Sequence, residues 1–145
     1  MNAGRIRPIA IGLVRRGDDI LVSEGRDPAS GEVFYRPLGG GIEFGEYGHQ
    51  ALIREMREEL GAELAAVRYL ATLENIFTYA GRSGHEIVQV YEAEFLDPSL
   101  YERDVMTGME DDNTPMRVMW KPKADFVDGE VTLYPDGFVA LVSEP

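Results

Sequence analysis

The sequence contains no cysteine, only two histidines and only two lysines among 145 residues. Without cysteine there is no disulfide framework, which agrees with a reducing compartment, so we expect a cytoplasmic protein. Long apolar runs are also absent, and no segment approaches the roughly 18 residues of a membrane-spanning helix. The apolar segment from Ile9 to Val14 is interrupted by Gly12 and is too weak for a signal peptide. We therefore expect no membrane partner.

Positive charge is scarce as well. Fourteen Lys and Arg residues face 26 Asp and Glu residues, which gives a net charge of −12. Non-specific binding of nucleic acid needs a basic surface, so we expect no nucleic-acid partner. An acidic protein that acts on a polyphosphate must also recruit cations. The length predicts a single domain over residues 1–145, which buries about two-thirds of the unfolded surface.

The segment from Gly48 to Leu60 predicts an amphipathic helix. Leu52, Met56 and Leu60 recur at intervals of four residues, and Gly61 is a typical C-terminal stop. At about 100° per residue, three carboxylates share one sector beside the apolar stripe, whereas two arginines are expected on the other side. The carboxylates are Glu55, Glu58 and Glu59, and the arginines are Arg54 and Arg57.

This grouping of carboxylates indicates a cation site. Glu55 and Glu59 form a like-charge pair four residues apart, which costs about 0.2–0.5 kcal/mol even when exposed. A bound cation would remove the conflict. Oxygen ligands in a chain without cysteine favour Mg²⁺ or Mn²⁺ over zinc. The alternative is a solvated helix face on which Arg54 pairs with Glu58.

The residues before the helix argue against a solvated face. The glycine run 39–41 lets the backbone approach a ligand closely, and Glu46 follows in the loop that enters the helix. Seven specified positions, each used at about 7% in average composition, coincide by chance in about one of 10⁸ windows. Chance therefore does not explain the spacing.

The segment from Gly40 to Ala62 resembles the Nudix box, G-x5-E-x7-R-E-U-x-E-E-x-G-U, where U is a bulky aliphatic residue. The matching residues are Gly40, Glu46, Arg54, Glu55, Met56, Glu58, Glu59 and Gly61. Ala62 departs from the usual Ile, Leu or Val, which weakens a packing contact and not the chemistry. The flanks also resemble the family, with an aromatic-Arg-Pro-Leu-Gly-Gly entry and a late strand that carries Trp120. The resemblance implies an α/β Nudix fold, a mixed sheet sandwiched between helices.

The same resemblance implies roles for the box residues. The implied metal ligands are Glu55, Glu58, Glu59 and the Gly39 carbonyl, and the implied catalytic residues are Glu55, Glu58, Arg54 and Glu46. Glu46 would tie the loop to the helix through Arg54. Either Glu55 or Glu58 is the general base, and the number of metal ions stays open.

The implied activity is Mg²⁺- or Mn²⁺-dependent hydrolysis of a pyrophosphate bond. Water attacks phosphorus in a nucleoside diphosphate linked to X and releases a nucleoside monophosphate and a phosphorylated X. X stays open among ADP-sugars, dinucleoside polyphosphates and nucleoside triphosphates. The alternative is a Nudix-fold nucleotide sensor without catalysis, although such proteins typically lose box carboxylates. The expected partner is a small nucleotide-derived substrate, with a possible homodimer.

Residues outside the box are weaker candidates. Arg36 is a candidate for a substrate phosphate or a surface strand residue, and Glu110 belongs to an acidic run (110–112) that either joins the site or is solvated. The aromatic candidates, either for stacking on a base or for filling the core, are Phe34, Tyr35, Phe77 and Tyr79.

The remaining pattern predicts mostly strands. Strands are expected over residues 5–16, 20–22, 65–78, 85–95 and 118–120, a loop from Asp97 to Pro115, and a short helix from Asp136 to Ser143.

Overall fold

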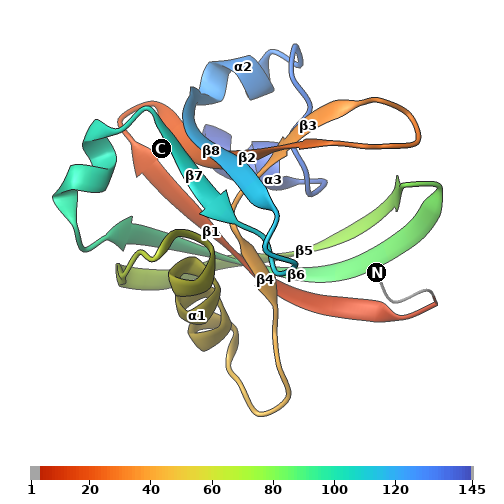
Figure 1. The fold of residues 1–145 in the computed structure, drawn as a ribbon, viewed down its shortest axis with the longest axis horizontal. Helices are drawn as coiled ribbons and strands as arrows, with labels where there is room; N and C mark the ends of the chain where they lie inside the picture. The colour runs from red at the N-terminus through yellow and green to blue at the C-terminus, as the bar shows by residue number, and fades with distance from the viewer. Residues whose placement is uncertain (1–3, 145) are drawn as a thin grey trace.

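The computed structural model describes residues 4–144 and confirms an α/β fold with a large mixed sheet (Figure 1). The elements are β1 (Ile6–Arg16), β2 (Asp19–Arg26), β3 (Val33–Arg36), β4 (Gly39–Gly41), α1 (Gly48–Leu60), β5 (Leu64–Tyr79), β6 (Arg82–Phe95), the 3₁₀ turn η1 (Pro98–Glu102), β7 (Val105–Met109), β8 (Pro115–Pro122), α2 (Lys123–Val127) and α3 (Phe138–Ser143). Among the described helices, none has the length and apolar character needed to cross a bilayer.

Strand β1 joins two halves of the sheet. The strand order is β5-β6-β1-β2-β8-β7, with β3 paired to β2 and β4 paired to β1. Residues 6–14 of β1 run parallel to β6, whereas Arg15 and Arg16 pair antiparallel with β2. Because β1 changes its partner along its length, the β2–β3 and β5–β6 hairpins diverge from it. The two hairpins form separate walls that project to the same side of the molecule (Figure 1).

Helices cover both faces of the sheet. Leu52 and Met56 of α1 are fully buried against a core that includes Trp120. A second core, on the side of α2 and α3, includes Phe126 and Phe138. The odd-numbered residues of β1 enter the second core and the even-numbered ones enter the first, so both faces of this strand are covered.

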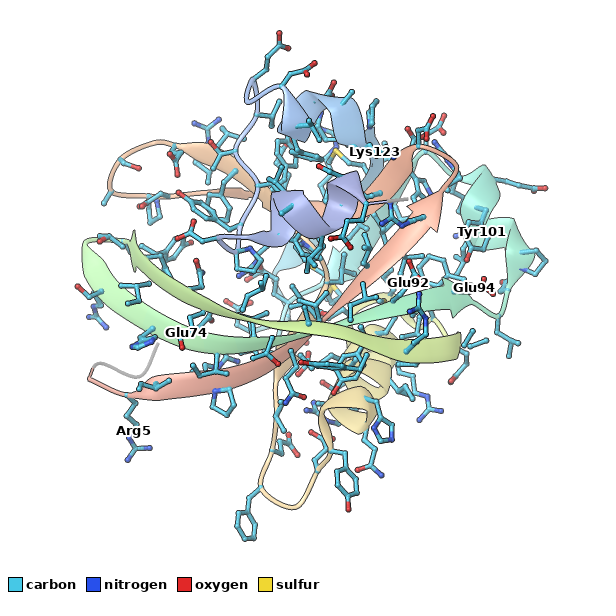
Figure 2. All side chains as sticks on the ribbon, turned by 180° about the vertical axis from the view of Figure 1, so that it is seen from behind. Arg5, Glu74, Glu92, Glu94, Tyr101 and Lys123 are labelled. Carbon is cyan, nitrogen blue, oxygen red and sulfur yellow. The ribbon has the colours of Figure 1, made fainter. Side chains whose placement is uncertain are left out.

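The acidic charge is spread over the surface as well as concentrated at α1. On the side opposite to that of Figure 1, Glu74, Glu92 and Glu94 project from β5 and β6 (Figure 2). Glu92 is partly neutralised by Arg15, whose Nε lies 3.4 Å from its Oε2, and by Arg68.

The structure corrects several predicted boundaries, and the strands predicted over residues 20–22 and 118–120 extend over Asp19–Arg26 and Pro115–Pro122. The segment 97–115, predicted as a loop, contains η1 and β7, because Val105–Met109 pairs with β8 and buries Met106. The pairing of β7 with β8 cannot be predicted from the residues of β7 alone. The C-terminal helix begins at Phe138 and not at Asp136, because Gly137 precedes it in a left-handed conformation (φ 88°).

Candidate active site

Helix α1 has the predicted bounds, and its packing sets the direction of its carboxylates. Ala51, Leu52 and Met56 have no exposed surface, which fixes the rotation of the helix. Gly61 ends it in a left-handed conformation (φ 64°), and its N–H donates to the Arg57 carbonyl at 2.8 Å. The acidic edge therefore faces the glycines of β4.

Glu55 is the buried carboxylate of this edge. It is 4% exposed and lies over Gly40, where an added Cβ would come within 2.5 Å of the Glu55 Cδ. Burial raises the pKa of Glu55, and the charges of Asp111 and Glu58 act in the same direction, whereas Arg54 opposes them. Gly40 thus provides the space in which this carboxylate lies.

Arg54 lies within the acidic group, and the prediction that it points to the other side of the helix is wrong. Arg54 and Glu58 are four residues apart and so differ by only about 40° around the helix. Arg54 Nε donates to Glu46 Oε2 at 2.9 Å, Nη2 donates to Glu46 Oε1 at 3.0 Å and to the Gly41 carbonyl at 2.9 Å, and Nη1 donates to Glu55 Oε1 at 3.0 Å.

The interpretation that Glu46 ties the loop to the helix agrees with these bonds. The hydrogen bond from Arg54, together with one from the Glu43 backbone N–H, lowers the pKa of Glu46 to about 2. One guanidinium thus fixes the loop, the β4 backbone and the Glu55 rotamer together.

Three carboxylates from two elements converge beside Arg54. One oxygen each of Glu55, Glu58 and Asp111 lies within 4.8 Å of the others. Glu58 is half exposed, and its Oε2 lies 3.3 Å from Arg54 Nη1. An oxygen-only set with a buried member of raised pKa fits a hard divalent cation such as Mg²⁺ or Mn²⁺. These residues therefore fit the metal that the sequence suggested.

Glu59 lies next to this group but is turned toward the backbone. Its Oε1 accepts a hydrogen bond from the Gly39 N–H at 3.1 Å. Burial raises the pKa of Glu59 to about 8, and the charge of Glu55 adds to this effect. Gly39 has room only for hydrogen, because an added Cβ would lie 2.0 Å from the Ala10 carbonyl oxygen. Glu59 and Gly39 are thus joined to each other at the edge of the group.

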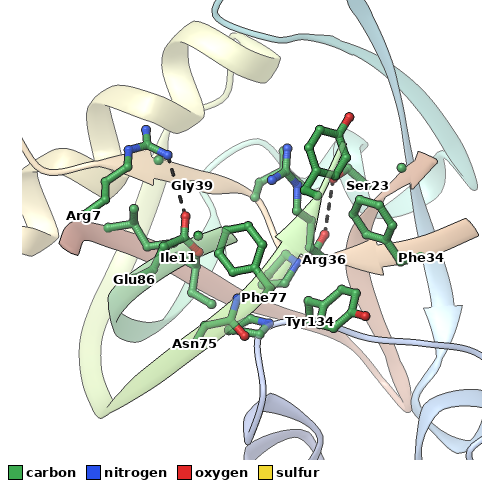
Figure 3. A pocket seen from close by; sticks show the side chains of 18 of the residues that line it. Arg7, Ile11, Ser23, Phe34, Arg36, Gly39, Asn75, Phe77, Glu86 and Tyr134 are labelled. Carbon is green, nitrogen blue, oxygen red and sulfur yellow. Dashed lines mark hydrogen bonds and ion pairs between the residues drawn. The ribbon is translucent and has the colours of Figure 1, made fainter. Parts of the chain in front are cut away.

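A pocket of about 650 Å³ opens between the two walls of the sheet and reaches this group. Beside the carboxylate group it is lined by Gly39, Gly40, Glu59 and Asp111. Farther along, Phe34, Asn75, Phe77 and Tyr134 line it (Figure 3), together with Tyr79. Arg36 and Glu110, the two weaker candidates, both line it, and Arg36 Nη2 lies 3.7 Å from Glu110 Oε1.

Sequence reasoning missed two residues of this site. The sequence shows the acidic run 110–112, but its spacing does not identify Asp111 as the member that faces α1. Nothing in the sequence singles out Asn75, which is buried in the C-terminal half of β5. Tyr35, considered for base stacking, is instead buried in the second core, and its hydroxyl donates to Glu24 at 2.9 Å.

Comparisons with known proteins agree with the motif. The family model for the NUDIX domain matches residues 5–130. The NAD-capped RNA hydrolase NudC of Pseudomonas aeruginosa is 40% identical over 68 residues, which cover 47% of this chain and 24% of that protein. The NudC of Stutzerimonas stutzeri is 38% identical over the same length. The aligned part is thus about a quarter of these relatives.

Solved structures show the same fold at low sequence identity. A NUDIX hydrolase from Nitrosomonas europaea has a TM-score of 0.65 at 15% identity, covering 95% of this chain and 86% of that one. The MutT protein of Bacillus halodurans has a TM-score of 0.62 at 16% identity, covering 96% and 81%. With the family model matched over residues 5–130, this chain belongs to the NUDIX domain family.

Proposed function

We propose that this Nudix domain is a Mg²⁺- or Mn²⁺-dependent pyrophosphohydrolase of a small nucleoside diphosphate linked to X. The observation that carries the proposal is the oxygen-only group of Glu55, Glu58 and Asp111 at one end of a pocket of about 650 Å³. That volume lies within the usual range for small-molecule sites.

Glu55, Glu58 and Asp111 would hold the metal, with the Gly39 carbonyl and Glu59 beside them. A divalent cation, when bound, neutralises phosphate charge and lowers the pKa of water. Arg54, itself held by Glu46, keeps Glu55 in place at 3.0 Å. Arg36, more than half exposed on the pocket wall, supplies a guanidinium to a substrate phosphate.

The proton of the attacking water needs an acceptor among these residues. Glu58 is half exposed, whereas Glu55 is buried and bonded to Arg54, so Glu58 is the more accessible of the two candidate bases. The water oxygen bonds to phosphorus as the bridging P–O bond breaks. A nucleoside monophosphate and phosphorylated X leave, and the proton passes from Glu58 to solvent.

The nature of X is narrowed by the charge of the chain. The relatives named above hydrolyse NAD-capped RNA, and NAD is itself two nucleotides joined by a diphosphate. A net charge of −12 disfavours a long RNA, so free dinucleotides and ADP-sugars are preferred within the proposed class.

The test is a panel assay with Mg²⁺. Purified protein is incubated with NAD, ADP-ribose, a dinucleoside polyphosphate, a nucleoside triphosphate and an NAD-capped oligonucleotide, and the products are separated by chromatography. We expect a nucleoside monophosphate from at least one of them, and Glu58→Gln should lower kcat by at least about 100-fold. Glu63→Gln, the same change at an exposed glutamate paired with Arg57, is the matched control.

If nucleotides bound to the protein but no member of the panel was hydrolysed, this result would contradict the proposal and favour the nucleotide sensor. Near-normal activity of Glu58→Gln with Mg²⁺ would show that the carboxylate group is not the catalytic metal site.

A further inference from the structure

An arginine of β1 lies on the pocket side of the glycine strand β4. Arg7 continues the row of alternate β1 residues, Ile9 and Ile11, that line the pocket. A Cβ added to Gly41 would lie 3.0 Å from Arg7 Nη2 and 3.5 Å from Arg7 Nε. The guanidinium therefore occupies the space that a side chain at position 41 would fill, and it lies against the bare backbone of β4.

The guanidinium of Arg7 is loosely held. Arg7 and Glu86 are opposite each other in the parallel pairing of β1 with β6, and Arg7 Nη1 lies 3.8 Å from Glu86 Oε2 (Figure 3). That separation is longer than a hydrogen bond. Within residues 4–144, the Arg7 side chain makes no hydrogen bond, and Glu86 is its one ion-pair partner. Because the side chain is also 42% exposed, its N–H groups are open to a ligand.

The open edge of β4 adds a backbone donor beside Arg7. The hydrogen bond from Ile42 N to the Pro8 carbonyl, at 3.0 Å, sets the phase of the pairing between β1 and β4. In this phase the N–H and C=O groups of Gly41 point away from β1. The carbonyl accepts a hydrogen bond from Arg54 Nη2 at 2.9 Å, whereas no partner of the N–H is found in the part of the chain that the structure describes. Gly41 thus offers an N–H group beside the Arg7 guanidinium.

These donors lie across β4 from the carboxylate group. A Cβ at Gly40 would point at Glu55, whereas one at Gly41 would point at Arg7, because successive residues of a strand face opposite sides. The Cα atoms of the two glycines are about 3.8 Å apart. A ligand at the open edge of β4 can therefore meet the metal with one group and Arg7 with the next.

We propose that Arg7 and the Gly41 N–H form an anion subsite for the second phosphoryl group of the substrate, the one that the metal does not hold. The inference rests on the proposed function and adds to it a residue that selects diphosphates over monophosphates. A diphosphate diester carries one negative charge on each phosphoryl group. The cation offsets the first charge, and Arg7 offsets the second through charge-assisted hydrogen bonds. Arg7 comes from β1 and Arg36 from β3, so the two guanidiniums reach the diphosphate from different strands.

The test measures the binding of probes that are not hydrolysed. Methylenediphosphonate carries two phosphoryl groups and methylphosphonate carries one, and their affinities are measured by calorimetry with saturating Mg²⁺. We expect the parent protein to bind the diphosphonate ten times or more tightly. Arg7→Gln should weaken the diphosphonate about tenfold, because a charge-assisted contact is lost. The affinity for methylphosphonate, which stays at the metal, should change less than about twofold.

Two control variants separate a contact with the ligand from other roles of Arg7. Arg5→Gln removes the same charge from an exposed residue that also lines the pocket, and solvent screens that charge, so the diphosphonate affinity should fall less than about twofold. Glu86→Gln removes the ion pair but keeps the guanidinium, so the affinity should stay the same or rise. If the ion pair acted only by holding β1 against β6, Glu86→Gln and Arg7→Gln would weaken binding alike.

The subsite would be overturned if folded Arg7→Gln bound the diphosphonate like the parent, weakened both probes equally, or was matched by Glu86→Gln. A parent protein without a preference for the diphosphonate would overturn it as well. Melting curves show whether each variant is folded. If Arg7→Gln is not, Arg7→Lys keeps the charge but loses the planar fork, and it should weaken the diphosphonate about threefold. Binding does not depend on turnover, so intact diphosphonate binding without hydrolysis of any substrate contradicts the proposed function alone.

Discussion

The two ends of the pocket are built in opposite ways. At the metal end, Glu55 and Glu58 come from one turn of α1 and are joined by Asp111 from the β7–β8 loop. At the far end, the rings of Phe34 and Phe77 and the amide of Asn75 come from strands on both walls. The first end concentrates carboxylates on a helix and a loop, whereas the second is formed by aromatic rings and polar side chains of the strands.

This difference separates the two expected tasks of the pocket. At the metal end, Arg54 holds Glu55 in place, but the crowded carboxylates of Glu55, Glu58 and Asp111 remain unfavourable until a cation joins them. The far end is held by rings that lie over glycines and by Asp27, which joins the two hairpins, before any ligand arrives. We therefore expect changes at the metal end to lower kcat and changes at the far end to raise KM.

An effect comparable to that of Glu58→Gln should come from Asp111, whose assignment to the metal end rests on the structure. Asp111→Asn removes one charge from the carboxylate group and should lower kcat about 100-fold, with little change in KM. Asp112→Asn is the matched control, because its Oδ1 still accepts the Thr114 N–H, seen at 3.0 Å. Equal activity of the two variants would remove Asp111 from the metal end.

A smaller effect is expected from Glu46, which acts on the metal end through Arg54. Glu46→Gln should lower kcat about tenfold by loosening Arg54 and Glu55. Glu43→Gln in the same loop should change less, because Glu43 Oε1 lies 3.7 Å from Arg54 Nη1 and is well exposed.

Glu46 also predicts a pH dependence of stability. Its folded pKa of about 2 lies below the ordinary value of 4.5, so its contribution is present above about pH 4.5 and is lost as the pH falls toward 2. The melting temperature of Glu46→Gln should thus lie below that of the parent at pH 7, and the gap should narrow between pH 5 and pH 3. A gap that is independent of pH would show that the charge is not responsible.

At the far end, Asp27→Ala tests whether the link between the two hairpins affects substrate binding and not the chemical step. Asp27 Oδ1 accepts hydrogen bonds from Ala29 N in the β2–β3 loop and from Ala80 N in the β5–β6 turn, and losing both should raise KM about fivefold and leave kcat nearly unchanged. Asp27→Asn retains that oxygen and should resemble the parent. A loss confined to kcat would show that the two ends are not separable.

The smallest effect expected is a thermal shift caused by metal alone. Mg²⁺ at 100 times its Kd stabilises by about 2.7 kcal/mol, which corresponds to roughly 5–10 °C for a chain of this size. The shift should be larger at pH 8 than at pH 6, because the raised pKa values of Glu55 and Glu59 let protons compete with the metal. No shift at saturating Mg²⁺ would indicate that the metal end assembles only with nucleotide.

The features that could be predicted from the sequence lie mostly in α1 and its entry loop, and those that could not depend on strand pairing. The bounds of α1 and the grouping of Glu55 with Glu58 were predictable, because residues within one helix are related by fixed geometry. The partnership of Arg54 with Glu46 followed from the family resemblance, whereas the helix geometry as applied to the sequence placed Arg54 on the wrong side. Asp111 and β7 were not, since their positions depend on pairing with β8. The role of Asn75 was not predictable either, because its burial in the pocket wall and its hydrogen bond to Asp136, 61 residues away, depend on the tertiary fold.

The most direct test of the metal assignment is anomalous diffraction from crystals soaked in Mn²⁺. The account predicts a peak coordinated by carboxylate oxygens of Glu55, Glu58 and Asp111, and the loss of that peak in Asp111→Asn. A peak held without Asp111, or no peak at saturating Mn²⁺ with a bound nucleotide analogue, would contradict it.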